Sequence, residues 1–158
     1  SLPVPSLILD AGCGPGRDLA RFAAHGHVPR GVDLNATFVA MAQAHAPVTR
    51  ADLRRIGSLY PPGTFDGIWA AASLVHLSDA EARDVLQQLA ALLRPGGRLF
   101  TCVMSEGETG WLEEPDGTRW YTAWEPHQLE AAVADAGLEV EETVAGPYVE
   151  LWATRPPT

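Results

Sequence analysis

The stretch LDAGCGPGR at residues 9–17 decides the fold of this 158-residue chain. The apolar run at residues 7–9 leads into it, and three glycines follow within five positions. A short apolar run that breaks into a glycine-rich loop is typical of a buried strand followed by a tight turn. From Asp18 onward apolar residues recur at helical spacing until Gly26, so we expect the loop to lead into a helix.

The same alternation repeats outward from this loop along the chain. Further strands are expected at residues 31–34, 48–52, 65–72, 97–104, 138–144 and 148–154. Three further helices are expected. The first has one face made of Phe38, Met41, Ala42 and His45, and the other two cover residues 78–94 and 126–136. This order predicts an α/β fold with a doubly wound, mostly parallel sheet and helices on both faces. The short link at residues 145–147 makes the last two strands antiparallel.

Residues 105–124 follow neither the helical nor the strand period. They are rich in Gly, Glu and Thr, and they contain the turn signal PDG at residues 115–117. They also hold Trp111, Trp120 and Trp124, which is unusual for a polar segment. We interpret this segment as a flap or a hairpin.

Composition narrows the class of protein. Hydrophobic residues make up 46% of the chain and charged residues 20%, which suits one globular domain over residues 1–158 and excludes a disordered protein. The formal net charge of −9 would repel a polyanion, and the arginine cluster at residues 50–55 is short. No apolar run approaches the ~20 residues that a membrane-spanning helix needs. We therefore expect no nucleic acid and no membrane as partners.

The cysteines and histidines argue against a disulfide framework and a metal site. Cys13 and Cys102 are the two cysteines, too few for either a disulfide scaffold or a cysteine-based zinc site. His25 and His27 stand close together, but no cysteine or carboxylate pair recurs near them at ligand spacing. We expect no metal, and a reducing cytoplasm is the simplest location.

The glycine loop is the first candidate for a binding site. In an open parallel sheet, ligands bind beyond the carboxyl ends of the strands. Gly12, Gly14 and Gly16 lack Cβ atoms, so the backbone there is able to turn sharply and a ligand is able to approach its amides. The following helix start favours an anionic group. Taken alone, the glycines fit an anion site or only a strand-to-helix turn.

An acidic residue at the end of the next strand gives a second signal. Asp33 follows Gly12 by 21 positions, a spacing at which an acid accepts hydrogen bonds from ribose hydroxyls. The alternative is that Asp33 only caps the following helix, although Asn35 or Thr37 would serve equally well. The glycine loop and the spaced acid together favour a nucleoside ligand.

These residues carry a resemblance to a known family. LDAGCGPGR at residues 9–17, GVDL at 31–34, ADL at 51–53, residues 65–77 and LRPGGRL at 93–99 resemble, in this order, the motifs of class I S-adenosylmethionine-dependent methyltransferases. The loop has the spacing G-x-G-x-G rather than the dinucleotide-binding G-x-G-x-x-G. The resemblance covers residues 6–155. It implies a seven-stranded sheet with the last strand antiparallel. The sequence departs from the family pattern at its start, where we expect the usual N-terminal helical segment to be lacking.

The resemblance also implies a set of contacts with S-adenosylmethionine. The residues expected to bind the cofactor are Asp10, Gly12, Cys13, Gly14, Gly16, Arg17, Asp33, Leu34, Asp52, Leu53 and Ala71. The glycine loop would hold the methionine part, Asp10 its ammonium group, Asp33 the ribose, and Asp52 the adenine amino group. Arg17 would pair with the cofactor carboxylate or is an ordinary solvated helix residue. Ala71 would add a backbone contact.

Methyl transfer from a sulfonium depends mainly on positioning and on a dry site. An oxygen or protonated nitrogen acceptor must still lose a proton, and His76 is the best-placed candidate base. The alternative is that His76 only packs or hydrogen-bonds near the cofactor. Tyr121 is a second candidate, within a flap at residues 105–124 that would cover the acceptor. The aromatic rings of that flap either line the acceptor site or pin the flap to the core.

The sequence therefore predicts a methyltransferase that moves a methyl group to an O, N or C atom of a small-molecule acceptor and releases S-adenosylhomocysteine. Two alternatives stay open. A binding module without catalysis, or a truncated one, would keep the same cofactor residues. An NAD-dependent oxidoreductase would require the longer glycine spacing. We expect a monomer or a homodimer.

Overall fold

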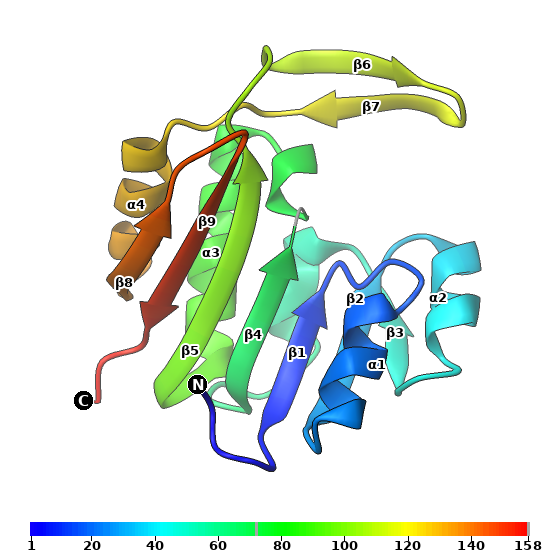
Figure 1. Ribbon diagram of the computed structural model, residues 1–158, viewed down its shortest axis with the longest axis vertical. Coiled ribbons are helices and arrows are strands. Elements are labelled where there is room, and N and C mark those ends of the chain that lie inside the picture. Colours follow the sequence, from blue (N-terminus) through cyan, green and yellow to red (C-terminus); the bar gives the residue numbers. More distant parts are fainter. Residues whose placement is uncertain (72, 158) are drawn as a thin grey trace.

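A computed structural model describes residues 1–71 and 73–157 (Figure 1). The main sheet has seven strands in the order β3-β2-β1-β4-β5-β9-β8. Their bounds are β1 Leu7–Ala11, β2 Val28–Asp33, β3 Val48–Arg50, β4 Phe65–Ala71, β5 Leu93–Met104, β8 Glu139–Val144 and β9 Tyr148–Thr154. β9 pairs antiparallel with both β5 and β8, and the pairs among β1 to β5 are parallel. The predicted fold class is confirmed.

Helices cover both faces of this sheet. Figure 1 shows α1 on the near face and α3 and α4 on the far face. The helices are α1 Arg17–Ala24, α2 Ala36–Ala42, α3 Asp79–Leu92 and α4 Pro126–Asp135, and two short 3-10 helices are η1 Leu53–Ser58 and η2 Leu74–His76. Among the described residues, no helix is both long and apolar enough to cross a membrane.

The longest helix, α3, begins and packs as its sequence predicts. Ser78 Oγ accepts a hydrogen bond from the Glu81 amide at 3.2 Å, and a Glu81 carboxylate oxygen accepts one from the Ser78 amide at 3.1 Å. This capping box satisfies two amides that the helix itself leaves unpaired. Val85, Leu86 and Leu89 are fully buried in the main core. Burial of each contributes about 1.5–3 kcal/mol.

The second helix is shorter than its sequence pattern predicts. α2 ends at Ala42, so His45 lies in the following turn, and Met41 is 53% exposed. The buried residues of α2 are Val39 and Ala42. Ala42 meets the glycine loop directly, because a Cβ placed on Gly16 would lie 2.9 Å from the Ala42 Cα.

The second strand begins earlier than expected, at Val28, and includes Pro29. Pro29 pairs with Ile8 of β1, whereas the pairing of β2 with β3 starts at Gly31. At Pro29, β2 therefore has a paired neighbour on one side only. A residue without an N–H is tolerated there because no ladder hydrogen bond is lost on the open side.

The segment at residues 105–124 contains a β-hairpin. β6 Gly110–Glu114 pairs antiparallel with β7 Gly117–Tyr121, and Trp111 lies opposite Trp120. The hairpin forms a separate two-stranded sheet beyond the carboxyl ends of β4 and β5 (Figure 1). The PDG turn signal and the polar, aromatic strands on either side account for this structure.

Candidate active site

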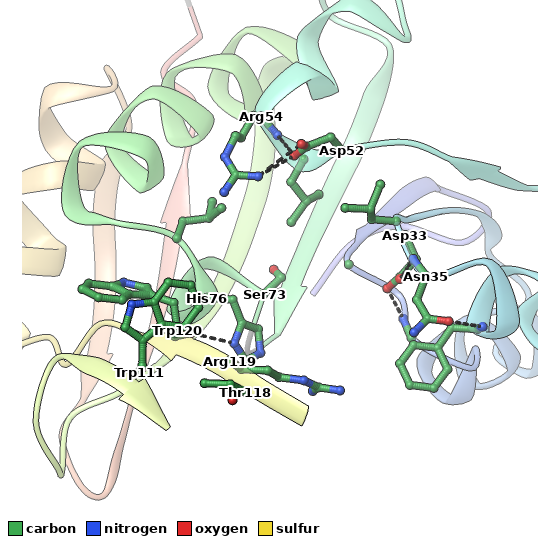
Figure 2. A pocket seen from close by; sticks show the side chains of 16 residues that line it. Asp33, Asn35, Asp52, Arg54, Ser73, His76, Trp111, Thr118, Arg119 and Trp120 are labelled. Carbon is green, nitrogen blue, oxygen red and sulfur yellow. Dashed lines mark hydrogen bonds and ion pairs between the residues drawn. The ribbon is translucent and has the colours of Figure 1, made fainter. Parts of the chain in front are cut away.

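A cavity of about 690 Å³ opens at the carboxyl ends of the parallel strands, between the glycine loop and the hairpin. Figure 2 shows its walls: Asp33 and Asn35 on one side, Asp52 and Arg54 on a second, and His76 with Trp111 and Trp120 on a third. The other lining residues are Gly12, Gly14, Leu34, Phe38, Leu53, Ser73, Leu77, Thr118 and Arg119. The cofactor motifs and the hairpin thus border one continuous space.

The glycine loop uses its own amides within the fold. The Gly12 and Cys13 amides both donate to the Val32 carbonyl, at 2.8 and 3.0 Å. The Gly14 amide donates to Asp33 Oδ2 at 2.9 Å. These three amides are therefore already paired within the protein. The hydrogen bonds hold the loop against the end of β2.

Two glycines of the loop have positive φ for different reasons. Gly12 has φ +80°, and a Cβ placed on it would lie 2.5 Å from Ser73 Cβ, too close for any residue but glycine. Gly14 has φ +55°, and a Cβ there would meet nothing within 4 Å. Gly12 therefore permits a close approach inside the protein, whereas Gly14 faces open space at the cavity.

Asp33 joins the glycine loop to the start of α2. One carboxylate oxygen accepts from the Gly14 amide, and the other accepts from the Asn35 amide at 2.9 Å. The cap of α2 is Asn35, whose side chain accepts from the Thr37 and Phe38 amides at 2.9 and 3.1 Å. The helix-capping explanation for Asp33 is therefore wrong. Asp33 lies at the cavity wall with acceptor capacity left on its carboxylate.

Asp52 is held by an arginine that the sequence analysis treated only as part of a short basic cluster. The Asp52 carboxylate accepts from the Arg54 amide at 3.0 Å and pairs with the Arg54 guanidinium at 3.1 Å. The same guanidinium bonds Glu81 at the start of α3, and this hydrogen bond lowers the pKa of Glu81 to about 2. Arg54 thereby ties the cavity wall to the longest helix.

Two buried polar atoms near the loop have no hydrogen-bond partner among the described residues. They are Asp10 Oδ2, at the end of β1, and Ser73 Oγ, two residues after β4. Asp10 is 3% exposed. Burial, reinforced by the negative charges of Asp18 and Asp33, raises the pKa of Asp10 to about 7. Unpartnered atoms of this kind are rare in folded proteins.

His76 lies in η2 at the hairpin side of the cavity. Its Nδ1 is 3.2 Å from the Trp120 carbonyl oxygen, which only accepts, so Nδ1 carries the proton of the neutral ring. Nε2 then keeps its lone pair and is able to accept a proton. The ring of Tyr121 packs against the His76 ring at 4.7 Å, edge to face. The Tyr121 hydroxyl donates to Glu114, and this hydrogen bond raises the pKa of Tyr121.

The structure does not bring every predicted residue to the cavity wall. The predicted residues that do not line it are Asp10, Cys13, Gly16, Arg17, Ala71 and Tyr121. The Arg17 side chain is 85% exposed and lies 3.9 Å from Asp18. The Cys13 thiol is buried, which raises its pKa to about 12. Residues 1–71 and 73–157 contain no cluster of three or more His, Cys, Asp or Glu side chains arranged to hold a metal ion.

Seven residues of the cavity wall were missed as site residues: Asn35, Phe38, Arg54, Ser73, Leu77, Thr118 and Arg119. Ser73 lies only three residues before His76, within the loop that the sequence analysis had assigned to the site. Its place after a predicted strand was a usable signal. Leu77 lies in the same loop, and Thr118 and Arg119 lie in the flap at residues 105–124 that was expected to cover the acceptor. Asn35 and Phe38 were interpreted only as helix residues, and the place of Arg54 depends on a contact with the distant Glu81.

Comparisons with known proteins agree with this geometry. Residues 8–97 match the family described as "Methyltransferase domain". Ubiquinone biosynthesis O-methyltransferase of Xanthomonas euvesicatoria pv. vesicatoria (strain 85-10) is 28% identical over 166 residues, which cover 94% of this chain and 68% of that protein. The protein of the same name from Xylella fastidiosa (strain 9a5c) is 30% identical, with 94% and 66% covered.

Solved structures share the fold over nearly the whole chain. An S-adenosylmethionine-dependent methyltransferase from Methanosarcina mazei has a TM-score of 0.90 at 15% identity, with 99% of this chain and 95% of that chain covered. The 1,6-didemethyltoxoflavin-N1-methyltransferase of Burkholderia thailandensis, solved with bound 1,6-didemethyltoxoflavin and S-adenosylhomocysteine, has a TM-score of 0.80 at 25% identity, with 97% and 72% covered. The match to the family extends over more than half of the chain, and the sheet order and cavity agree with it. The chain belongs to the S-adenosylmethionine-dependent methyltransferases.

Proposed function

We propose that this enzyme transfers a methyl group from S-adenosylmethionine to an oxygen or nitrogen atom of a small aromatic molecule, which binds under the hairpin. One observation carries the proposal: a single cavity joins Asp33 and Asp52 to His76 and to the rings of Trp111 and Trp120. Aromatic walls favour a flat apolar acceptor. Methylation of a C–H carbon would also release a proton, so carbon nucleophiles are included in the acceptor screen below.

The acidic residues of the site suit the cofactor. Asp33 would accept hydrogen bonds from the ribose hydroxyls, and Asp52 would accept one from the adenine amino group, with the Leu53 amide beside it. The unpartnered, buried carboxylate oxygen of Asp10 suits the ammonium group, because a buried charge requires an opposite one. Arg17 points to solvent, so its expected pairing with the cofactor carboxylate would need a rotation of its side chain.

The chemistry divides between cofactor and protein. S-adenosylmethionine, when bound, supplies a methyl group on a positively charged sulfur that leaves readily. The protein then has to orient the acceptor, exclude water and take up a proton. We assign proton uptake to His76 Nε2, because Nδ1 is committed to the Trp120 carbonyl. We assign Tyr121 the task of holding the His76 ring, since its own hydroxyl is engaged by Glu114.

Calorimetric titration tests the cofactor half of the proposal. S-adenosylhomocysteine is expected to bind saturably and NAD not at all. Asp33→Ala is expected to weaken S-adenosylhomocysteine binding by roughly 10- to 150-fold, the loss of hydrogen bonds to a charged group. Asp135→Ala, an exposed change on α4, is the matched control and should leave the affinity unchanged. Binding of NAD, or an unchanged affinity of the Asp33 variant, would contradict the assignment.

A methyl-transfer screen tests the acceptor half. Phenols, catechols, nitrogen heterocycles and carbon nucleophiles form the panel, because an O-methyltransferase and an N1-methyltransferase are among the similar proteins. His76→Gln is expected to lower kcat by about 10²- to 10⁴-fold and to leave S-adenosylhomocysteine affinity within twofold. A normal kcat for His76→Gln would show that His76 is not the base and would favour the alternative that it only packs or hydrogen-bonds near the cofactor. Binding without turnover of any acceptor would instead favour the non-catalytic module.

We further infer that the enzyme works in the cytoplasm, without nucleic acid, as a monomer or homodimer. The net charge of −9 opposes binding of a polyanion, and Cys13 and Cys102 are unpaired thiols. Light scattering of the purified chain, with and without DNA, tests the oligomeric state and the absence of nucleic acid. A stable complex with DNA would contradict the inference.

A further inference from the structure

Ser73 carries a buried hydroxyl with no partner, at the wall of the cavity. The residue is 8% exposed, and its Oγ has no hydrogen-bond partner among the described residues. A buried polar atom left unpaired destabilises the folded state, so such atoms are normally bonded. The fold tolerates this cost at a position that borders the cavity. A ligand atom is the natural partner.

The position of Ser73 identifies the part of the ligand that it faces. A Cβ placed on Gly12 would lie 2.5 Å from Ser73 Cβ and 3.4 Å from Ser73 Oγ. The hydroxyl therefore lies directly against the glycine loop. Asp10, the second residue with an unpartnered atom, lies on β1, which is the neighbour of β4 in the sheet. Two unsatisfied polar atoms thus lie at the same edge, at the ends of adjacent strands.

The charges near Asp10 and Ser73 favour a positively charged ligand group over a negatively charged one. The negative charges of Asp18 and Asp33 both act on Asp10. The basic side chain nearest in sequence to the loop, Arg17, is 85% exposed and lies beside Asp18. A carboxylate placed here would be repelled, whereas an ammonium group would be attracted. An ammonium group also brings three donors, enough for a carboxylate and a hydroxyl together.

We propose that Ser73 is a cofactor-binding residue whose Oγ accepts a hydrogen bond from the amine at the amino-acid end of S-adenosylmethionine. The assignment rests on the proposed function, because it requires the cofactor to lie in this cavity. It adds a side-chain contact from the loop after β4, where the sequence indicated only a backbone contact at Ala71. Ser73 would share the amine with Asp10.

Three probes separate the amine from the rest of the ligand. S-adenosylhomocysteine carries both amine and carboxylate, decarboxylated S-adenosylmethionine keeps the amine alone, and 5′-methylthioadenosine has neither. Calorimetry is expected to show that Ser73→Ala weakens the first two about tenfold and changes the third by less than twofold. Loss for S-adenosylhomocysteine alone would assign the carboxylate and overturn the proposal. An equal loss for all three probes would also overturn it.

Protein stability supplies a readout that a structural serine would not give. Because the hydroxyl has no partner among residues 1–71 and 73–157, Ser73→Ala should leave the Tm unchanged or raise it while the affinity falls. Ser73→Cys keeps most of the volume with a weaker acceptor and should show the same pattern. Ser58→Ala is the matched control, since Ser58 is exposed and its Oγ donates to the Arg55 carbonyl outside the cavity.

The outcomes distinguish this inference from the proposed function. If the unaltered protein binds none of the three probes, the proposed function fails. If it binds S-adenosylhomocysteine and both Ser73 variants bind equally well, the assignment of Ser73 alone is wrong. A fall in Tm that parallels the fall in affinity would assign Ser73 to packing and overturn the proposal.

Discussion

Two sides of the cavity are built in opposite ways. One is the side proposed to hold the cofactor, formed by Gly12, Gly14, Asp33 and Asp52 and called the cofactor wall below, and the other is the hairpin of β6 and β7. At the cofactor wall, the Gly14 amide, the Asp33 carboxylate and the Asn35 amide are bonded to one another within a parallel sheet. In the hairpin, Trp111 is 72% exposed and Leu112 is 52% exposed, and the two strands pair only with each other. The first wall is held by hydrogen bonds between neighbouring elements of the main domain, whereas the second is a two-stranded sheet with exposed apolar side chains. A common cofactor and a variable acceptor require this division.

The largest loss of stability is expected at Gly12, where the protein has no space for a side chain. Gly12→Ala adds a Cβ that would lie 2.5 Å from Ser73 Cβ, at a φ of +80°. We expect unfolding to become easier by about 3–5 kcal/mol and S-adenosylhomocysteine binding to be lost. Gly14→Ala, also at positive φ but with open space, should cost only about 1 kcal/mol. Chemical denaturation compares the two, and equal costs would refute the close-approach argument.

Asp10 makes the stability of the cofactor wall depend on pH. Its pKa is about 7 in the folded protein, against an ordinary value of 3.8, so the folded state holds the proton more tightly. Stability is therefore lost as pH rises through this range, by about 2 kcal/mol between pH 5 and pH 7. Asp10→Asn should remove this part of the pH dependence in urea titrations. Parallel pH profiles for the variant and the unaltered protein would contradict the assignment.

Bound S-adenosylhomocysteine should shift Asp10 from the protonated form to the ionised form. Its ammonium group favours the ionised carboxylate, so binding should release a proton and tighten as pH rises from 6 to 8. Titration in buffers of different ionisation enthalpy measures the released proton. Asp10→Asn should release none at this site.

An intermediate effect is expected where the two regions are joined. Thr122 is 5% exposed, and its hydroxyl donates to the Leu77 carbonyl at 2.6 Å and accepts from Trp120 Nε1 at 2.9 Å. Its amide also donates to the Val75 carbonyl at 2.8 Å. Thr122→Val keeps the shape but removes both side-chain bonds, so we expect a loss of about 1–3 kcal/mol and faster hydrogen exchange in the hairpin.

Thr122→Ser is the control for this joint, because serine retains the hydroxyl. Its stability should fall by less than about 1 kcal/mol. If valine and serine destabilise the protein equally, packing rather than hydrogen bonding attaches the hairpin.

The smallest effect on stability is expected at the hairpin surface. Trp111→Ala removes a ring that packs edge to face on Trp120 at 5.5 Å but is mostly exposed. We expect a stability change below about 1 kcal/mol, an S-adenosylhomocysteine affinity within twofold, and at least a tenfold higher KM for whichever acceptor the screen identifies. Leu112→Ala, on the neighbouring exposed position, is the control. A cofactor affinity that falls as far as the acceptor KM rises would assign Trp111 to the cofactor wall.

The cofactor wall was largely predictable from sequence because its signals are local. The glycine loop and the spacing to Asp33 depend on a turn and on one strand-helix-strand unit, and Gly12, Gly14 and Asp33 do line the cavity. The capping of α3 at Ser78 is likewise a short-range pattern. The length of α2 was mispredicted, since Gly16 packs against its end through a contact that spacing does not encode.

The remaining features depend on contacts between distant segments. Arg54 reaches Glu81, 27 residues away, and Ser73 meets Gly12 across two strands. The sequence indicated the loop that holds Ser73, but whether its buried hydroxyl lacks a partner depends on every neighbour at once and is not encoded in a local pattern. The direction of the Arg17 side chain was not predictable either, because this side chain is 85% exposed and its ion pair is with the neighbouring Asp18.

The arginine bridge beside the cavity has a consequence for ionic strength. Arg54, Asp52 and Glu81 have side chains 47%, 35% and 37% exposed, so dissolved salt screens their attraction. Asp33, in contrast, is held by two neutral backbone amides, which salt affects little. Under the proposed function, the Asp52 end of the site, which is assigned to adenine, is therefore the part whose ion pairs weaken as salt concentration rises. Cofactor affinity in this enzyme should fall with added salt mainly through the position of Asp52.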